Sequence, residues 1–222
     1  MKLCIAAAAA VLFATAPARA QGIDKYRDQG YSVSAVTPVF GQLVKMSFPR
    51  NFVPAFQNTK GDFYIQENVL RGEDINNWTQ MVSLTGKKEL ASKPGATAKA
   101  LLGGMAAGFQ RACQFSYAVK ILSDAKIDGY EAVMAVVSCG VSPTTAGKTS
   151  ETALIVVIKG QADMYTIQWA ERGERSDTPI QIDVSKWQDR FKALSPIRLC
   201  PIVPGEKPPF PTCVGGGQKS PA

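Results

Sequence analysis

Apolar and polar residues alternate along several short segments of the chain, as expected of β-strands with one buried face. Turn signals such as Asp128-Gly129 and Gly160 separate some of these segments. The alternating segments are residues 31–35, 43–48, 63–70, 78–85, 115–121, 130–141, 152–159 and 164–170. The run from Ala153 to Ile158 is continuously apolar and predicts a strand buried on both faces. Successive strands joined by short turns predict an antiparallel meander.

In two other segments the apolar residues recur at the spacing of an α-helix. Thr97 is an acceptable N-cap for a helix over residues 97–112. Ser185 and Gln188 match a capping box at the start of a helix over residues 184–194. The expected buried stripes are Leu101, Met105, Phe109 and Ala112 in the first helix, and Val184, Trp187, Phe191 and Leu194 in the second.

Three glycines, Gly103, Gly104 and Gly108, lie inside the first predicted helix. Each interior glycine costs about 1 kcal/mol relative to alanine, so we expect close packing as the compensation. Gly104 and Gly108 share a helix face, a spacing that also supports helix dimerisation in membranes. Charged Lys99 and Arg111 flank this short helix and favour close packing on a sheet instead. These glycines are not a phosphate-binding loop, because the Gly-Lys-Ser/Thr ending of that motif is missing.

Together these elements predict an α+β fold with an antiparallel β-sheet of about six to seven strands. Two main helices, at about 97–112 and 184–194, cover the sheet, and disulfides staple the fold. No internal repeat or linker divides residues 21–199, so we expect a single α/β domain there. A proline-rich loop follows at 200–213, and the glycine-rich start of residues 214–222 predicts a disordered tail.

The order of elements resembles that of the periplasmic DcrB and photosynthetic PsbP-like proteins over residues 40–195. The resemblance rests on a strand ending in Ser47-Phe48-Pro49, with Phe52 shortly after, then a central helix, a meander and a final amphipathic helix. It implies an α/β sandwich with a non-enzymatic accessory role, and it carries over no functional residues. The paired cysteines and the proline-rich end are not part of the DcrB and PsbP-like pattern.

Residues 1–20 have the parts of a removable signal peptide. Lys2 is followed by an apolar run from Leu3 to about Phe13, shorter than the roughly 20 residues that span a bilayer. Ala18-Arg19-Ala20 then offers small residues where a signal peptidase cuts. We therefore expect a mature chain from Gln21, exported to the periplasm or secreted, with no transmembrane segment after signal removal.

Removal of residues 1–20 lowers the formal net charge from +7 to +5, because Lys2 and Arg19 leave. The remaining basic residues are spread along the chain rather than gathered in a stripe with interleaved aromatics. Nucleic-acid binding needs such a stripe, so we expect no nucleic-acid partner. An envelope protein, polymer or lipid is the expected partner class, since moderate positive charge favours anionic surfaces.

The four cysteines of the mature chain predict two disulfides, because an even number of cysteines in an oxidising compartment is typical of structural disulfides. Of three connectivities, we favour Cys113–Cys139, which lie opposite if the strands around the 122–130 turn pair antiparallel, and Cys200–Cys213. The second pair encloses five prolines, and so few backbone donors predict no regular structure there. A redox-active Cys-x-x-Cys pair is missing.

The chain contains no histidine. This excludes Ser-His-Asp and Cys-His catalysis and the usual zinc ligand sets. With no cofactor motif either, we expect no cofactor or metal. Catalysis by two carboxylates about 5–9.5 Å apart stays open, with Asp62, Glu67, Glu73 and Asp74 as candidates. Enzymatic activity is therefore uncertain, and a non-catalytic role is favoured.

Aromatic side chains and the proline-rich loop are the remaining binding candidates. Trp78 and Trp169, with Tyr165 and Phe63, are candidates to line a groove, although core packing is their commoner role. Phe210 is a candidate contact because a rigid loop binds at little ordering cost. The loop's alternative role is to seal the second helix against the sheet.

We therefore interpret the sequence as an exported envelope binding or accessory protein without catalytic activity. One alternative is a carboxylate-based hydrolase of envelope polymers. The other is a secreted inhibitor or host-interaction protein that presents the Cys200–Cys213 loop.

Overall fold

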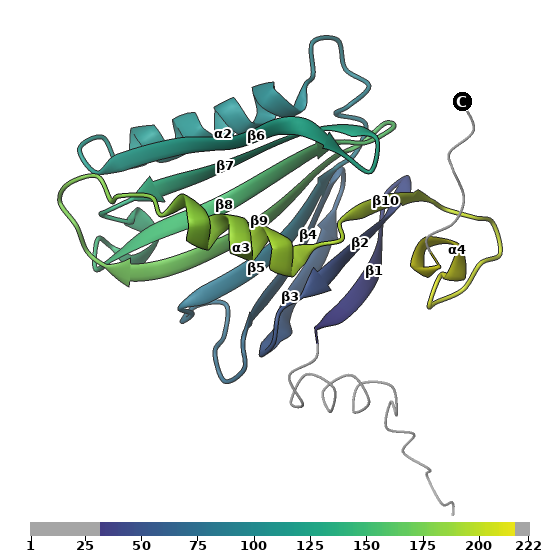
Figure 1. Ribbon diagram of the computed structural model, residues 1–222, viewed down its shortest axis with the longest axis horizontal. Helices are drawn as coiled ribbons and strands as arrows, with labels where there is room; N and C mark the ends of the chain where they lie inside the picture. The colour runs from purple at the N-terminus through teal and green to yellow at the C-terminus, as the bar shows by residue number, and fades with distance from the viewer. Residues whose placement is uncertain (1–31, 216–222) are drawn as a thin grey trace, which may run out of the picture.

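Strands form two antiparallel sheets in the computed structural model, which describes residues 32–215 (Figure 1). The larger sheet has seven strands in the order β3-β4-β5-β9-β8-β7-β6, and the smaller has three in the order β1-β2-β10. The larger sheet contains β3 (Phe52–Lys60), β4 (Phe63–Leu70), β5 (Gln80–Lys87), β6 (Tyr117–Ile127), β7 (Tyr130–Cys139), β8 (Thr149–Lys159) and β9 (Met164–Glu174). The smaller contains β1 (Val33–Val39), β2 (Gln42–Phe48) and β10 (Arg198–Pro201).

The main helices are α2 (Ala98–Ala112) and α3 (Val184–Leu194). There are also a one-turn helix α4 (Pro211–Val214) near the C-terminus and a 3₁₀ turn η1 (Pro143–Thr145) between β7 and β8. The predicted α+β fold with an antiparallel sheet, two main helices and disulfides is confirmed. The separate three-stranded sheet was not expected. The predicted signal peptide, residues 1–20, lies outside the described residues, as does most of the predicted tail, from residue 216 onward. The start of that tail is corrected, because Val214 belongs to the helix α4.

The chain builds the larger sheet in two parts. Strands β3 to β5 form one meander, β6 to β9 form another, and α2 carries the chain from β5 to the edge strand β6. β9 then returns beside β5 and pairs with it from Gln80↔Glu171 to Lys87↔Met164. This one long pairing joins the two meanders into a single sheet.

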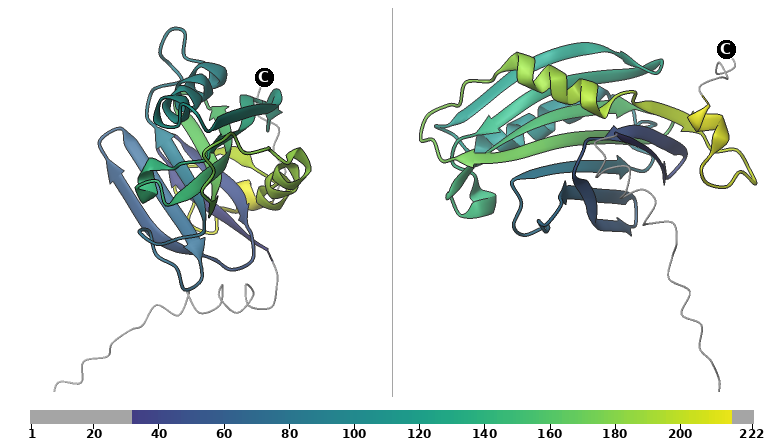
Figure 2. Two further views of the ribbon diagram at one scale, coloured as in Figure 1. Left: turned by 90° about the vertical axis from the view of Figure 1, so that its left-hand side faces the viewer. Right: turned by 60° about the horizontal axis from the view of Figure 1, so that its bottom comes forward.

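The two main helices cover opposite faces of the larger sheet, as the end-on view in Figure 2 shows. Along β8, successive side chains alternate between the two cores. Leu154, Val156 and Ile158 belong to the α3 side, and Ala153, Ile155 and Val157 belong to the α2 side. The prediction that this strand is buried on both faces is confirmed.

Each main helix begins at a side-chain cap. The Thr97 side chain accepts a hydrogen bond from the Ala100 amide (3.0 Å), as predicted for α2. The predicted capping box of Ser185 is wrong, because Asp183 is the N-cap and its carboxylate accepts from the Lys186 amide (3.1 Å). Ser185 already lies in the first turn of α3.

The prediction that the α2 glycines pack closely on the sheet is wrong. A Cβ atom added at Gly103, Gly104 or Gly108 would meet no atom within 4 Å. The helix instead turns Ala98 and Leu102 to the sheet, and the three glycines do not contact it. No packing contact at these positions therefore offsets the cost of the glycines.

Two strands of the structure have no counterpart in the sequence pattern. β3 contains Pro54, which interrupts a ladder; it is tolerated because β3 is an edge strand with a register shift between Pro54 and Phe56. β10 is only four residues long and ends at Pro201, and it forms by pairing with β2 across Cys200↔Leu43. β3 therefore forms a hairpin with the adjacent β4, whereas β10 depends on β2, which lies far away in the sequence.

A buried carboxylate ties the turn between β1 and β2 to the larger sheet. Asp163, 2% exposed, accepts hydrogen bonds from the amides of Gly41 (2.8 Å) and Glu89 (2.7 Å). It also accepts one from the Tyr165 hydroxyl (3.2 Å). Burial raises the pKa of the Tyr165 hydroxyl, and the negative charge of the nearby Asp163 raises it further. Three segments thus share one acceptor.

Candidate functional site

The candidate binding surface follows β10, where the chain leaves the small sheet. We call residues 200–214 the C-terminal loop. Cys200 and Cys213 are joined by a disulfide, with Cα atoms 5.6 Å apart, and both are buried. The disulfide packs on Leu43 of β2, with Phe210 partly buried against the same cluster. The loop is therefore anchored at both ends to the small sheet.

Hydrogen bonds inside the loop fix its shape further. The Glu206 carboxylate accepts from the amide and the hydroxyl of Thr212, both at 2.8 Å. Pro211–Val214 forms the helical turn α4, and Lys45 of β2 donates to the Val214 carbonyl (3.1 Å). The expectation that residues 200–213 have no regular structure is thus corrected, because β2 supplies a pairing partner at one end and α4 forms at the other.

Several apolar side chains of the C-terminal loop face outward. Ile202 is 45% exposed, Val203 39% and Val214 47%, while several prolines beside them are also exposed. Figure 1 shows the loop and α4 projecting beyond the small sheet at the end of the molecule. The result is a rigid apolar projection on the surface.

Phe210, the contact predicted from sequence, has a different place in the loop. Its side chain is only partly exposed and packs toward the disulfide. Its backbone has a φ of 58°, a left-handed conformation that is uncommon for a bulky residue. Phe210 therefore positions the loop, and Ile202 and Val203 present the accessible apolar surface.

The two tryptophans predicted as groove residues lie in separate cores. Trp169 of β9 packs edge-to-face on Phe52, with ring centres 5.3 Å apart, on the α3 side. Trp78 precedes β5 and packs on the α2 side beneath the Arg172 guanidinium, 3.7 Å from the ring centre. The larger sheet lies between them, so they do not line one groove.

The other two aromatic candidates also do not join a groove with Trp169 and Trp78. Tyr165 is fully buried, and Phe63 is 39% exposed at the start of β4.

Arg190 of α3 is a largely enclosed cation on the α3 side of the larger sheet. Its guanidinium lies 4.8 Å from the Trp169 ring centre and 4.6 Å from that of Trp187. Glu171 accepts from Arg190 at 2.5 Å and also pairs with Lys186. Burial lowers the pKa of Arg190, and Glu171 opposes that shift. This arrangement holds α3 to β9.

The carboxylates proposed for hydrolysis are spread along β4 and its flanking turns. Asp62 precedes β4 and pairs with Lys87 at 2.6 Å, whereas Glu73 and Asp74 follow its other end. An eight-residue strand spans roughly 26 Å, well beyond the separation of a glycosidase pair.

Glu73 and Asp74 accept hydrogen bonds within their own loop. Glu73 accepts from Thr79, and Asp74 accepts from the amides of Asn76 and Asn77. Glu67 lies within β4, where burial raises its pKa.

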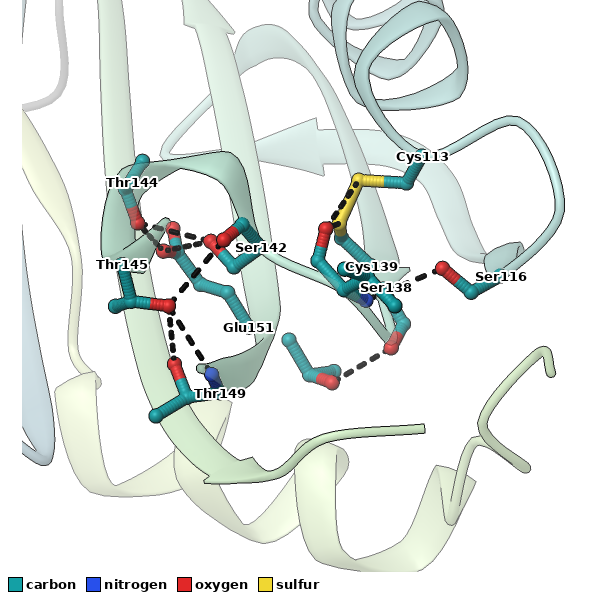
Figure 3. Close-up of a disulfide and its surroundings, with 11 residues drawn as sticks. Cys113, Ser116, Ser138, Cys139, Ser142, Thr144, Thr145, Thr149 and Glu151 are labelled. Carbon is teal, nitrogen blue, oxygen red and sulfur yellow. Dashed lines mark hydrogen bonds between the residues drawn. A yellow bond between two sulfur atoms is a disulfide. The ribbon is translucent and has the colours of Figure 1, made fainter. Parts of the chain in front are cut away.

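A pocket opens beside the Cys113–Cys139 disulfide, whose surroundings Figure 3 shows. The two cysteines pair as favoured from sequence, with Cα atoms 5.5 Å apart. However, Tyr117 pairs with Cys139, and Cys113 is the C-cap of α2 rather than a strand residue. The pocket has a volume of about 180 Å³.

The pocket walls come from three parts of the chain. Its lining residues are Gly108, Phe109, Ala112, Cys113, Cys139, Ser142, Pro143, Thr144 and Glu151. Sequence reasoning did not select this site. Its only signal is a run of hydroxyl residues between Cys139 and Glu151, which resembles an ordinary loop.

Within residues 32–215, no group of three or more Cys, Asp or Glu side chains is arranged to hold a metal ion. No helix in that described range is both long enough and apolar enough to cross a bilayer.

No family model and no curated protein matches the chain. Among solved structures, it is similar to a protein of Bacteroides thetaiotaomicron, with 13% identity and a TM-score of 0.38, covering 74% of this chain and 47% of that one. The chain thus spans about half the length of that protein. It is also similar to the Ran-binding protein Mog1p of Saccharomyces cerevisiae, with 7% identity and a TM-score of 0.40, covering 73% of this chain and 85% of that one. Neither match tests the resemblance to DcrB and PsbP-like proteins, which stays a prediction.

Proposed function

We propose that the chain is an exported accessory protein without catalytic activity, which binds a protein partner in the bacterial envelope through its C-terminal loop. The observation that carries this proposal is the exposure of Ile202, Val203 and Val214 on a disulfide-closed, internally hydrogen-bonded loop. Exposed apolar side chains gathered on a projection are typical of protein interaction sites.

The energetics of such a loop favour binding. Fully burying a Val or Ile side chain gives about 1.5–3 kcal/mol, so the exposed parts of these three offer on the order of 2–4 kcal/mol together. A flexible loop would lose much of that gain in ordering its backbone, whereas a preorganised loop does not. The disulfide and the Glu206–Thr212 hydrogen bonds supply that preorganisation.

Two formed disulfides support export. Disulfides persist in oxidising compartments and are rare in the cytosol. Four of the chain's five cysteines are paired, and the fifth, Cys4, belongs to the predicted signal peptide. An envelope or secreted location is therefore part of the proposal.

Photo-crosslinking in intact cells tests the partner class. A photoreactive amino acid at Ile202 is expected to yield a discrete protein adduct, which mass spectrometry identifies. Ile121 is the matched control, because this edge-strand residue is 55% exposed and distant in sequence from the loop. Lipid or polymer adducts alone, or the same adducts from both positions, would overturn the proposal.

A variant pair tests the loop's contribution to affinity for the captured partner. Ile202→Ser with Val203→Ser is expected to weaken binding on the order of ten-fold or more, since the exposed parts of these two side chains offer about 1.3–2.5 kcal/mol. Val119→Ser with Ile121→Ser removes similar exposed apolar surface from β6 and is expected to leave affinity unchanged. Equal weakening by both double variants would contradict a role specific to the loop.

The inhibitor alternative uses the same loop. It differs only in that the captured partner would be an enzyme whose activity falls on binding. The hydrolase alternative gains no support from Asp62, Glu73 and Asp74, whose positions are described above.

A further inference from the structure

The pocket beside the Cys113–Cys139 disulfide has one charged group and largely apolar walls. Phe109, Ala112 and the disulfide form the apolar side. Figure 3 shows the other lining residues Glu151, Ser142 and Thr144 grouped together. This site lies on the α2 side of the larger sheet and is separate from the C-terminal loop.

The Glu151 carboxylate is oriented by hydroxyl groups, and its cross-strand neighbour Arg172 on β9 is directed to Trp78 instead of forming an ion pair with it. It accepts hydrogen bonds through Oε2 from Thr144 (2.9 Å) and Ser142 (3.3 Å). No Lys or Arg among residues 32–215 forms an ion pair with it. Its other oxygen, Oε1, has no hydrogen-bond donor in that part of the chain.

The segment that presents these groups is itself fixed. The Ser142 amide donates to the Thr149 carbonyl, and the Ser142 carbonyl accepts from the Gly147 amide. The Thr145 hydroxyl forms hydrogen bonds with both the hydroxyl and the amide of Thr149. On the other side of Ser142, the Val141 amide donates to the buried Ser116 hydroxyl (3.1 Å). The pocket is therefore preformed rather than dependent on a ligand for its shape.

We propose that this pocket binds a small primary amine whose apolar body is about the size of one aromatic ring. A cavity of about 150 Å³ is enough for one benzene-sized molecule, and this pocket is slightly larger. An ammonium group carries three donors and no acceptor, so it matches a carboxylate with an unused oxygen. Partial burial strengthens such a charge pair relative to bulk water.

Titration of the oxidised protein with three matched compounds tests this assignment. Benzylamine, benzyl alcohol and benzoate share a ring and differ in charge. Heteronuclear NMR is expected to show saturable shifts at pocket amides with benzylamine, at least ten-fold tighter than with benzyl alcohol, and none with benzoate. Equal affinity for the amine and the alcohol, or no saturable binding by either, would overturn the proposal.

Substitution of Glu151 tests the contribution of its charge to amine affinity separately from that of the cavity. Glu151→Gln keeps an acceptor for Thr144, and it is expected to reduce benzylamine affinity to that of benzyl alcohol. Glu174→Gln is the matched control, because Glu174 is an exposed carboxylate on β9 outside the pocket lining. Unchanged benzylamine affinity in Glu151→Gln would contradict the role of the carboxylate.

Gly108→Leu tests the cavity without disturbing the carboxylate. Gly108 lines the pocket and an added Cβ meets no atom within 4 Å, so a leucine there adds bulk at the pocket wall without a clash at its Cβ. Binding of both benzylamine and benzyl alcohol is expected to disappear in this variant. Retained binding of either compound would place the amine elsewhere on the surface.

Discussion

The guanidinium of Arg190 lies over the ring of Trp169, 4.8 Å from the ring centre, and so joins helix α3 to the central strand β9. The same guanidinium lies over Trp187 and pairs with Glu171. Its side chain is 14% exposed, which sets it apart from the surface ion pairs of α3. This cation is therefore a structural element of the α3-side core.

Arg190→Ala is expected to lower the free energy of unfolding by about 2–4 kcal/mol. The change removes a stacked, partly buried cation and leaves Glu171 with Lys186 alone. Urea unfolding followed by tryptophan fluorescence measures the loss. Lys192→Ala is the control on the same helix, since its pair with Asp189 is exposed and contributes about 0–1 kcal/mol. Equal losses from both variants would contradict the special position of Arg190.

Two glycine-to-alanine changes are expected to have opposite signs. Gly104→Ala should stabilise the protein by about 0.5–1 kcal/mol, because Gly104 is helical and faces open space. Gly140→Ala should destabilise it, because the added Cβ would clash with the Ser176 carbonyl and the Ser116 side chain. Thermal unfolding of both variants gives the comparison. A stabilising Gly140→Ala would show that the approach of residues 140 and 176 is looser than described.

Asp163→Asn is expected to cost roughly 2–4 kcal/mol. The amide group replaces an acceptor oxygen by a donor, so at least one buried N–H or O–H loses its partner. Hydrogen exchange should show faster exchange at Gly41 and Glu89, the two amides that Asp163 accepts from. Asp177→Asn serves as the surface control, because Asp177 is exposed and pairs with the exposed Arg175. Unchanged exchange at both amides would contradict the shared-acceptor role.

The stability of the Glu67→Gln variant relative to the wild type is expected to increase as pH rises. Burial raises the pKa of Glu67 in the folded protein above the value of about 4.3 for an unfolded chain. Folding therefore favours the protonated form, so this contribution is present below about pH 4 and is lost as pH rises through the folded pKa.

The measurement is the difference in urea midpoint between Glu67→Gln and wild type from acid to neutral pH. The difference should grow with pH and level off above the folded pKa. A difference that shrinks with rising pH would mean that the fold favours the Glu67 carboxylate.

Local patterns predicted the larger sheet well where period and burial agree. The apolar run of β8 indicated burial on both faces, and the Asp128-Gly129 turn led to the correct Cys113–Cys139 pairing. The same reasoning missed β3 and β10, because their prolines disfavour strands; β3 pairs with the adjacent β4, whereas β10 pairs with the sequence-distant β2. It also misjudged the α2 glycines, since sequence does not show which face of a helix meets the sheet.

The binding candidates were harder to predict than the elements. The C-terminal loop was selected from its cysteines and prolines, with Phe210 as the expected contact, whereas the structure exposes Ile202 and Val203 there. The packing of Phe210 toward the disulfide depends on Leu43, 167 positions earlier in the chain. The Glu151 pocket needs α2, β7 and β8 brought together, and no short sequence pattern encodes that meeting.

Partner binding in the envelope requires an exported, fully oxidised chain, so intact mass spectrometry of the protein from a periplasmic extract is the most direct test. The mass is measured before and after reduction and alkylation. The expected result is a chain that begins at Gln21, takes up no alkylating groups before reduction and takes up four after it. A chain that retains residues 1–20, or that reacts as a free thiol before reduction, would contradict export and the two-disulfide fold.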